Sequence, residues 1–377
     1  MEAPCWVGFG FVGFRPVPEQ ESPVELHPRP LPLPLGGRQP GIAKLRPCWS
    51  YAAALTGDGH LVLSGFLGGG PRRSLCLPGG DCRDLLTSEQ YLLLLYKDRA
   101  ECWDTGSLGS AGLRGDPFWK MDLSGDEDNV LPLLSTGYVS LKPPFFKELP
   151  HHLRAQKLVL GNEHALLLST DWTVYSWGSG RHGQLGHRGL EDVSEPRTVE
   201  ALHGMPMGDV AAGGWHSVSV SEAGDIYVWG WNESGQLGLP CKTLSKVTKR
   251  TTAVLQEGMG AGRNSVEKIS HEGEATKACE NDFRAEFISV QAFPALLDLP
   301  EGAEAAKAGC GSRHTAVVTR HGSLYTWGWG KYGQLGHRDT ASSDYPKLVE
   351  YFSQQQLYVQ DVVCGSWSTY VLTVESK

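Results

Sequence analysis

The sequence has no run of 18 apolar residues, and we therefore expect no transmembrane helix. Residues 1–4, Met-Glu-Ala-Pro, contain no basic side chain, which argues against a secretory signal peptide. The nine cysteines are an odd number, and no two of them have the spacing of a zinc knuckle or a redox pair. These absences predict an intracellular protein with free, buried thiols and no membrane segment.

Basic side chains are also fewer than acidic ones. The chain has 34 Lys and Arg against 42 Asp and Glu, which gives a net charge of −8 at pH 7. A protein that clamps DNA through its phosphates needs a basic face. We therefore expect no direct DNA binding, whereas basic partners such as histone tails remain electrostatically acceptable.

The motifs of common catalytic sites are missing as well. The glycine run at 68–70 lacks the lysine of a phosphate-binding loop. The sequence contains neither a Gly-x-Ser-x-Gly elbow nor a His-Glu-x-x-His pair. We predict that the protein is not an enzyme, and that it binds no cofactor and no metal ion.

The sequence is instead rich in glycine and tryptophan, with 47 Gly and 12 Trp, and it contains an internal repeat. Each copy has a Gly, a His three residues later, a Trp-Gly pair beginning 13 residues after the His, and Gly-Gln-Leu-Gly beginning 19 residues after it. The three clear copies span 161–187, 213–239 and 311–337. Chance does not produce three such matches, so the chain is built from a repeat.

The pattern inside each copy is typical of short antiparallel strands. Two runs rich in β-branched and aromatic residues stand between the His and the Trp, and in two copies a glycine-containing turn separates them. This arrangement indicates a β-hairpin, and Gly-Gln-Leu-Gly marks a second turn. Four short strands in about 50 residues describe one blade of a β-propeller, so we predict an all-β propeller.

Spacing between the copies sets the number of blades. Weaker copies begin at Tyr51, near Gln90 and at Ser368, so six blades are visible. A degenerate seventh leaves the expectation at six or seven four-stranded blades. The polar segment 240–286 falls in the longest interval and has no Trp-Gly pair, and we interpret it as a flexible insertion.

We expect a single domain that closes on itself. The repeat that starts at Ser368 needs a Trp-Gly strand beyond the last residue, Lys377, and the aromatic, glycine-rich segment from Trp6 to Phe14 is similar to that missing strand. Pairing of the two ends would leave no exposed sheet edge. The predicted parts of the domain 1–377 are a closing strand at 1–15, degenerate blades at 42–157, and clear repeats at 158–239 and 287–377.

These motifs resemble a known family. A Gly-x-x-His strand start, Trp-Gly and then Gly-Gln-Leu-Gly, on a repeat of about 50 residues, are similar to the repeats of the regulator of chromosome condensation. The likeness is specific over 158–239 and 305–377 and faint over 1–157. Because nearly the whole chain is propeller, it most resembles the small single-domain chromatin members of that family.

The resemblance implies a non-enzymatic protein-interaction scaffold in chromatin regulation. It implies a location in the nucleus and on chromosomes, with the cytoplasm as a second compartment. The implied partner is a JmjC-domain oxygenase of the histone demethylase class, with histones as further partners and effects on histone methylation, spindle organisation and chromosome segregation. A guanine-nucleotide exchange factor for a small GTPase and a cytoskeletal adaptor stay open as alternatives, and a monomer is expected.

The candidate residues fall into two groups. Side chains that recur in every copy are expected to be structural, with the imidazoles bonded to a neighbouring strand rather than to a metal ion and the indoles packed between blades: His164, His216, His314, Trp177, Trp229, Trp327, Gln184, Gln236 and Gln334. Side chains at variable positions beside the His or the Trp-Gly are candidates for partner binding, with packing against the next blade as the alternative: Trp215, Arg313, Trp367, Trp231 and Trp329. The segment 138–147, which contains Pro-Pro-Phe-Phe, is interpreted as a connection between blades whose Phe residues fill the core, with a partner-binding strip as the alternative.

Overall fold

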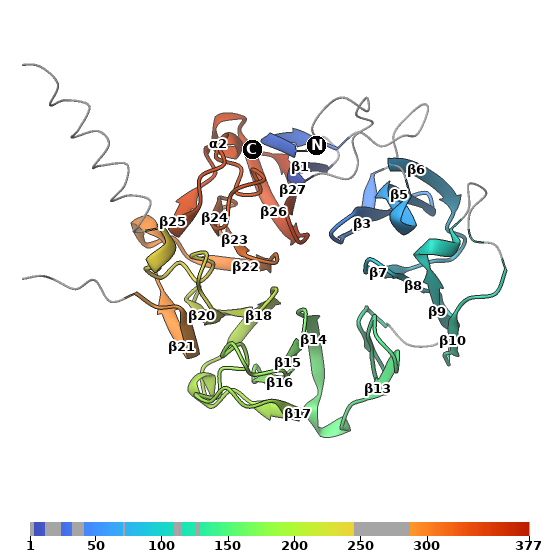
Figure 1. The fold of residues 1–377 in the computed structure, drawn as a ribbon, viewed down its shortest axis with the longest axis horizontal. Coiled ribbons are helices and arrows are strands. Elements are labelled where there is room, and N and C mark those ends of the chain that lie inside the picture. The colour runs from blue at the N-terminus through green and yellow to red at the C-terminus, as the bar shows by residue number, and fades with distance from the viewer. Residues whose placement is uncertain are drawn as a thin grey trace, which may run out of the picture.

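The protein is a closed ring of β-sheets (Figure 1). The computed structural model describes residues 4–11, 24–31, 41–70, 72–108, 113, 115–124, 129–244 and 287–376. Seven antiparallel sheets stand around a central axis, and each forms one blade of a β-propeller. The predicted all-β propeller is therefore confirmed, with seven blades.

Blades 1 to 3 come from the less regular first part of the chain. Blade 1 contains β3 (Ile42–Pro47), β4 (Tyr51–Thr56), β5 (His60–Phe66) and β6 (Arg72–Pro78). Blade 2 contains β7 (Asp84–Thr87), β8 (Tyr91–Leu95), β9 (Arg99–Asp104) and β10 (Trp119–Asp122). Blade 3 has three described strands, β11 (Leu133–Leu134), β12 (Gly137–Val139) and β13 (Phe146–Glu148).

Blades 4 to 6 contain the clear repeats, and blade 7 joins the two ends of the chain. Blade 4 contains β14 (Ala155–Leu160), β15 (His164–Ser169), β16 (Val174–Gly178) and β17 (Val193–Thr198). Blade 5 contains β18 (Met207–Ala212), β19 (His216–Ser221), β20 (Ile226–Trp231) and β21 (Val290–Leu297). Blade 6 contains β22 (Ala305–Cys310), β23 (His314–Thr319), β24 (Leu324–Gly328) and β25 (Ser343–Leu348). Blade 7 contains β26 (Leu357–Cys364), β27 (Ser368–Glu375), β1 (Cys5–Phe11) and β2 (Val24–Pro30).

Helices are short and lie in the connections. Those whose bounds lie within the described residues are the 3-10 turns η1 (Leu67–Gly69), η2 (Thr105–Ser107), η3 (His151–Leu153), η4 (Glu200–Leu202) and η5 (Pro300–Gly302), and the helix α2 (Glu350–Gln354). No helix in the described part of the chain has the length and apolar character that crossing a membrane requires.

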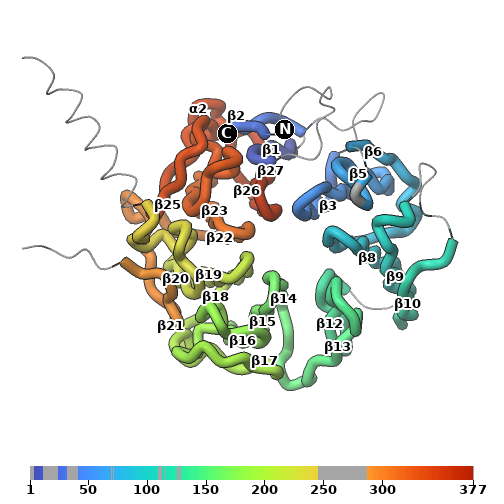
Figure 2. The backbone as a smooth tube through the Cα atoms, viewed as in Figure 1, coloured from blue at the N-terminus to red at the C-terminus, as the bar shows by residue number. Residues whose placement is uncertain are grey.

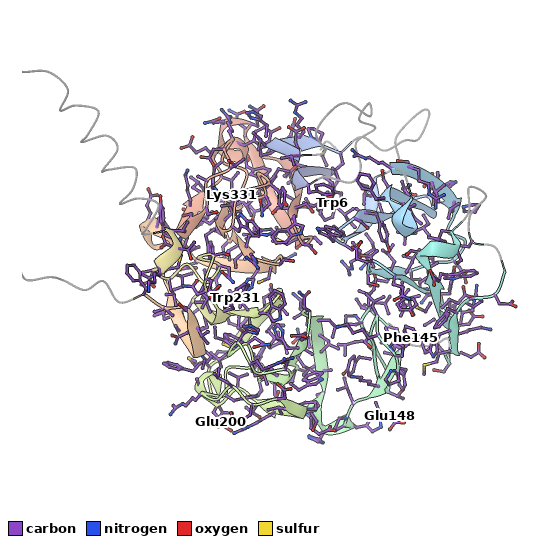
Figure 3. The ribbon with its side chains drawn as sticks, in the orientation of Figure 1. Trp6, Phe145, Glu148, Glu200, Trp231 and Lys331 are labelled. Carbon is purple, nitrogen blue, oxygen red and sulfur yellow. The ribbon has the colours of Figure 1, made fainter. Side chains whose placement is uncertain are left out.

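Blade 3 is the blade that spacing alone does not reveal. Its strands are two or three residues long and carry no Trp-Gly pair, so they leave no repeat signal. The interpretation of 138–147 as a connection between blades is wrong, because this segment contributes β12 and the start of β13. Phe145, between them, is buried and packs edge-on against Tyr91 of blade 2 with ring centroids 5.1 Å apart (Figure 3).

The long interval between His216 and His314 holds a single blade. Strands β20 and β21 pair directly, although one ends at Trp231 and the other begins at Val290. The insertion predicted at 240–286 therefore enters between the third and fourth strands of blade 5. Its residues 245–286 lie outside the described residues, so the prediction of flexibility stays a prediction.

Blade 7 closes the ring as predicted. Strand β1 pairs with β27 so that Gly10 faces Ser368 and Phe9 faces Thr369. In blade 6 the corresponding pairs join Gly328 to His314 and Trp327 to Thr315. Phe9 therefore occupies the repeat's tryptophan position, and the two ends of the chain lie side by side (Figure 2).

The first strand of each blade faces the centre, and the blades pack on one another through apolar side chains. A cavity of about 1090 Å³ on the axis is lined by residues from all seven first strands. Strand β1 contributes to two cores between blades. Phe9 packs with Ala316 of blade 6, and Trp6 packs with Leu45 of blade 1.

Candidate protein-interaction surface

The side chains that recur in each copy of the repeat form a relay of hydrogen bonds between neighbouring blades. His216 Nε2 lies 3.0 Å from the Thr315 hydroxyl, and that hydroxyl donates to the carbonyl oxygen of Gln236 at 2.7 Å. Because the hydroxyl hydrogen is directed to the carbonyl, the imidazole hydrogen resides on Nε2 and is donated to the hydroxyl oxygen. Trp327 Nε1 donates to the same carbonyl at 2.9 Å. The hydroxyl and the indole thus share one acceptor, and His216 is linked to it through the hydroxyl.

The same relay recurs at two further junctions. Its members are His164 Nε2 with Ser217 Oγ at 2.9 Å, Ser217 Oγ with Gln184 O at 2.8 Å, Trp229 Nε1 with Gln184 O at 2.9 Å, His314 Nε2 with Thr369 Oγ1 at 3.0 Å, and Thr369 Oγ1 with Gln334 O at 2.8 Å. Trp177 differs, because blade 3 has no Gly-Gln-Leu-Gly. Its Nε1 donates to the Tyr138 hydroxyl at 3.2 Å instead.

The glutamine side chains hold the turn that presents each carbonyl. Each Oε1 accepts from the backbone N–H two residues earlier: Gln184 from His182 at 2.8 Å, Gln236 from Ser234 at 2.9 Å, and Gln334 from Tyr332 at 2.9 Å. All three glutamines are fully buried, and their Nε2 atoms have no hydrogen-bond partner among the described residues. The side-chain oxygen therefore holds the turn, whereas the side-chain nitrogen donates to no group among the described residues.

We expect the relay histidines to be neutral at pH 7. Burial lowers the pKa of His164 to about 4 and that of His314 to about 3. Burial, followed by the charges of the two flanking histidines, lowers the pKa of His216 to about 3. Nowhere in the described ranges do three His, Cys, Asp or Glu side chains form a group that could hold a metal ion.

Removing the middle of one relay is expected to destabilise the protein. Thr315→Val keeps the shape of the side chain but leaves the buried Nε2–H of His216 without an acceptor, which costs about 1–3 kcal/mol. Thr315→Ser keeps a hydroxyl at this position, as Ser217 does at the preceding junction. We therefore expect a smaller loss of stability from this variant. Urea unfolding followed by tryptophan fluorescence measures both variants, and equal losses would show that the hydroxyl contributes nothing.

The five variable positions proposed for partner binding lie together on one face of the ring. In antiparallel blades, the loop between the first and second strands and the loop after the third strand emerge on the same side. Backbone bonds join these loops in pairs, from Trp231 N–H to the Trp215 carbonyl at 2.9 Å and from Trp329 N–H to the Arg313 carbonyl at 2.8 Å. Trp367 occupies the matching position in blade 7 and accepts from Phe11 N–H at 2.9 Å.

The side chains at these positions contact one another and, with one further tyrosine, form a continuous row. We call this row the aromatic arc: Trp215, Trp231, Arg313, Trp329, Tyr332 and Trp367. Trp215 and Trp231 meet edge-to-face at 5.5 Å, and Trp329 and Trp367 do so at 4.9 Å. The Arg313 guanidinium carbon stands 4.6 Å from the ring centroid of Trp231 and 5.0 Å from that of Trp329. Arg313 therefore joins the two tryptophan pairs into one surface.

The arc is partly open to solvent. Its four tryptophans and Arg313 are half-buried, and Tyr332 is 38% exposed. The alternative, packing against the next blade, is also realised. Trp231 contacts Arg313 of blade 6, and Trp329 contacts Trp367 of blade 7. At one end, Trp215 Nε1 donates to Glu163 at 3.0 Å, and Arg181 pairs with the same carboxylate at 3.9 Å.

Two members of this neighbourhood were not predicted. Tyr332 lies 6.1 Å from Trp329 and 5.7 Å from Trp367, and His182 lies 5.7 Å from Trp215 and 5.8 Å from Trp231. Both stand directly before Gly-Gln-Leu-Gly, at a position that varies among the repeats. Variation beside an invariant turn is the signal that could have found them.

A seven-bladed propeller in which this relay joins blades 4 to 7 defines the regulator of chromosome condensation class. The repeat model of that name (RCC1) matches residues 173–220, 223–250 and 321–372, and a second model of the same repeat matches 209–236 and 306–334. Human RCC1 domain-containing protein 1 is 46% identical to the chain over 393 aligned residues, which cover 98% of the chain and 97% of the relative. The mouse protein of the same name is 44% identical with equal coverage. The chain therefore belongs to the RCC1 repeat family.

Solved structures show the same fold. The crystal structure of Prp20p from Saccharomyces cerevisiae, reported with its binding to Gsp1p and histones, superposes with a TM-score of 0.68. The superposition covers 99% of this chain and 92% of Prp20p, at 15% sequence identity. At that identity the likeness establishes the fold alone, and it agrees with the propeller predicted from the repeats.

Proposed function

We propose that the protein is a non-enzymatic interaction scaffold in chromatin regulation, located in the nucleus and on chromosomes and also in the cytoplasm. The observation that carries this proposal is the aromatic arc. Four half-buried tryptophans and an arginine in contact form the kind of surface on which binding energy concentrates. Proteins that are soluble and monomeric seldom leave such a patch without a partner.

The proposed partner is a JmjC-domain oxygenase of the histone demethylase class. Through it, the protein would affect histone methylation, spindle organisation and chromosome segregation. Support comes from the family: the chain resembles the family's small chromatin members, and RCC1 domain-containing protein 1 is similar to it along its full length. Histones are a second proposed partner, because Prp20p, which has the same fold, is reported to bind them.

An exchange factor for a small GTPase is the alternative that the fold favours. Exchange needs no catalytic acid or base, only a surface that disturbs the nucleotide site, and Prp20p binds Gsp1p. A panel of small GTPases loaded with fluorescent nucleotide tests this function directly. Accelerated nucleotide release would favour it, whereas unchanged release from every member would leave the scaffold. A cytoskeletal adaptor is a third candidate, without an observation of its own.

We expect substitutions in the arc to release the partner. Tagged wild-type protein, purified from nuclear extract with its partners and analysed by mass spectrometry, should retain a JmjC-domain oxygenase near stoichiometry. Trp329→Ala with Trp367→Ala should reduce that recovery at least about tenfold, because large buried hot-spot side chains contribute about 2 kcal/mol or more each.

The matched control for this experiment is Trp172→Ala. Trp172 is 53% exposed and lies in the turn between β15 and β16, on the face opposite to the arc. This variant should recover the oxygenase as the wild type does. Recovery of a small GTPase that excess nucleotide removes would point to the exchange factor instead. Equal recovery by the arc variant would show that the partner binds elsewhere.

A further inference from the structure

Arg313 differs from the other half-buried arginines. Arg46 pairs with Asp84 at 3.5 Å, Arg99 donates to Glu101 at 2.7 Å, and Arg73 donates to the Leu108 carbonyl at 2.6 Å. Within the described residues, the Arg313 guanidinium donates no hydrogen bond and pairs with no carboxylate. A guanidinium has five N–H donors in a fixed plane, and such a group, partly removed from water, is usually satisfied by an acceptor.

Two indoles hold this guanidinium in place without using its donors. Its central carbon lies 4.6 Å from the centroid of Trp231 and 5.0 Å from that of Trp329. Contacts with ring faces engage the charge of the guanidinium and limit its movement, while the N–H groups at its edge stay free. The side chain is therefore ordered in advance for a planar acceptor with two oxygens.

An apolar cluster adjoins the guanidinium on one side. Trp329, Trp367 and Tyr332 contact one another, with ring centroids between 4.9 and 6.1 Å apart. Trp329 belongs both to this cluster and to the pair that holds Arg313. A ligand side chain on the cluster would thus lie beside the free edge of the guanidinium.

The exposed charged side chains near Arg313 are of both signs. Exposed Lys331 precedes Tyr332 in the loop after β24, in the blade next to that of Trp231 (Figure 3), and exposed Glu233 stands in the corresponding loop after β20. The carboxylate at the end of the arc, Glu163, is already engaged by Arg181 and Trp215. A ligand carboxylate that reaches the centre of the arc is therefore matched by the Arg313 guanidinium, whereas a basic group at that point would be repelled by it.

We propose that Arg313 binds an Asp or Glu carboxylate of a partner segment, and that Trp329, Trp367 and Tyr332 receive a large aliphatic or aromatic side chain next to it. This inference rests on the proposed function, since it names the chemistry of the segment that the scaffold recognises. A carboxylate accepts two parallel N–H bonds from a guanidinium, a geometry that gives direction as well as affinity. The recognised segment is then acidic and apolar, not a basic tail.

An oriented peptide library tests the proposal on the full-length protein. Immobilised peptides carry Glu, phosphoserine, Gln or Lys at one fixed position, with Leu, Phe or Ser one or two residues away and mixed residues elsewhere. We expect retention of the protein on the Glu peptides with Leu or Phe, and weaker retention on the matched Gln and Ser peptides. Preference for Lys or phosphoserine, or no retention above a Gly-Ser peptide, would overturn the proposal.

Variants then assign the preference to Arg313. Arg313→Leu should weaken binding of the best Glu peptide about tenfold to a hundredfold and remove its advantage over the Gln peptide. Arg313→Lys keeps the charge but cannot donate two parallel hydrogen bonds to one carboxylate, so it should retain only part of that advantage. Arg181→Leu is the control, because Arg181 lies on the same face with its guanidinium already held by Glu163 and Ser179.

The outcomes separate this inference from the proposed function. A melting temperature within a few degrees of the wild type shows that Arg313→Leu is folded. If that variant still recovers the nuclear partner and still prefers the Glu peptides, the carboxylate proposal is wrong while the scaffold stands. If the wild type recovers no chromatin partner but prefers the Glu peptides, the proposed function is wrong while the chemistry of the arc holds.

Discussion

Deletion of residues 1–15 should lower the melting temperature by more than about 10 °C, because several core side chains are lost at once and each costs about 2–5 kcal/mol. Phe9 and Val7 are fully buried, and Trp6 is nearly so. The deletion would empty the cores that β1 shares with blades 6 and 1. It would also expose the edge of β27, which pairs with β1 from Cys5 to Gly10.

Adding the strand back distinguishes closure from a general loss of stability. A synthetic peptide of residues 1–15 binds only the folded, open ring, so the melting temperature of the shortened protein should rise as the peptide concentration increases, with a logarithmic dependence well above the Kd. The same peptide with Phe9→Asp would place a carboxylate in the apolar core and should have no effect. If the deletion leaves the melting temperature unchanged, the two ends of the chain do not close the propeller.

The fold could be predicted where one residue type at one position has one physical task. Gly230, for example, has φ of 106°, and a side chain there would meet the backbone oxygen of Trp215 at 2.5 Å. The geometry of the blade therefore requires glycine at this position, which is why the Trp-Gly pair identifies a blade. Blade 3 carries no such pair, because its short strands are held by general apolar packing, for example of Leu134 and Val139 on blade 2. Many sequences satisfy packing of that kind, and spacing cannot detect it.

The candidate surface was predicted in part for a related reason. Trp215 and Trp367 stand beside a fixed repeat residue, so the repeat itself places them on one face. That Arg313 lies between two indoles depends on the rotation from one blade to the next, which sequence spacing does not contain. The same holds for the relay, in which a hydroxyl of the following blade stands between each histidine and the backbone.

Acidification from pH 7 to pH 5 is expected to lower the free energy of unfolding by roughly 5 kcal/mol. In the unfolded chain, imidazoles bind protons near pH 6.5. In the folded protein, burial lowers the pKa of His164 to about 4 and of His314 and His216 to about 3. The folded state therefore binds fewer protons throughout this window, so stability is complete above pH 6.5 and falls as the pH drops.

Other groups titrate in ways that the experiment separates. Burial also lowers the pKa of His187, and that of His337 to about 4, which adds to the effect in the same direction. Carboxylates gain protons only near and below about pH 4, so they leave the range from pH 5 to 7 to the histidines. Urea unfolding at pH 7, 6 and 5, followed by tryptophan fluorescence, gives the slope.

Single variants assign the slope to the relay. His216→Gln removes one buried imidazole and should reduce the pH dependence by up to about 1.4 kcal/mol per pH unit, whatever it does to stability at pH 7. His321→Gln, at an exposed position in the turn between β23 and β24, is the control for replacing a histidine outside the relay. A wild-type stability that is flat between pH 5 and 7 would mean that the relay histidines are protonated in the folded ring. Each would then need an acceptor at Nδ1, where the described residues provide none.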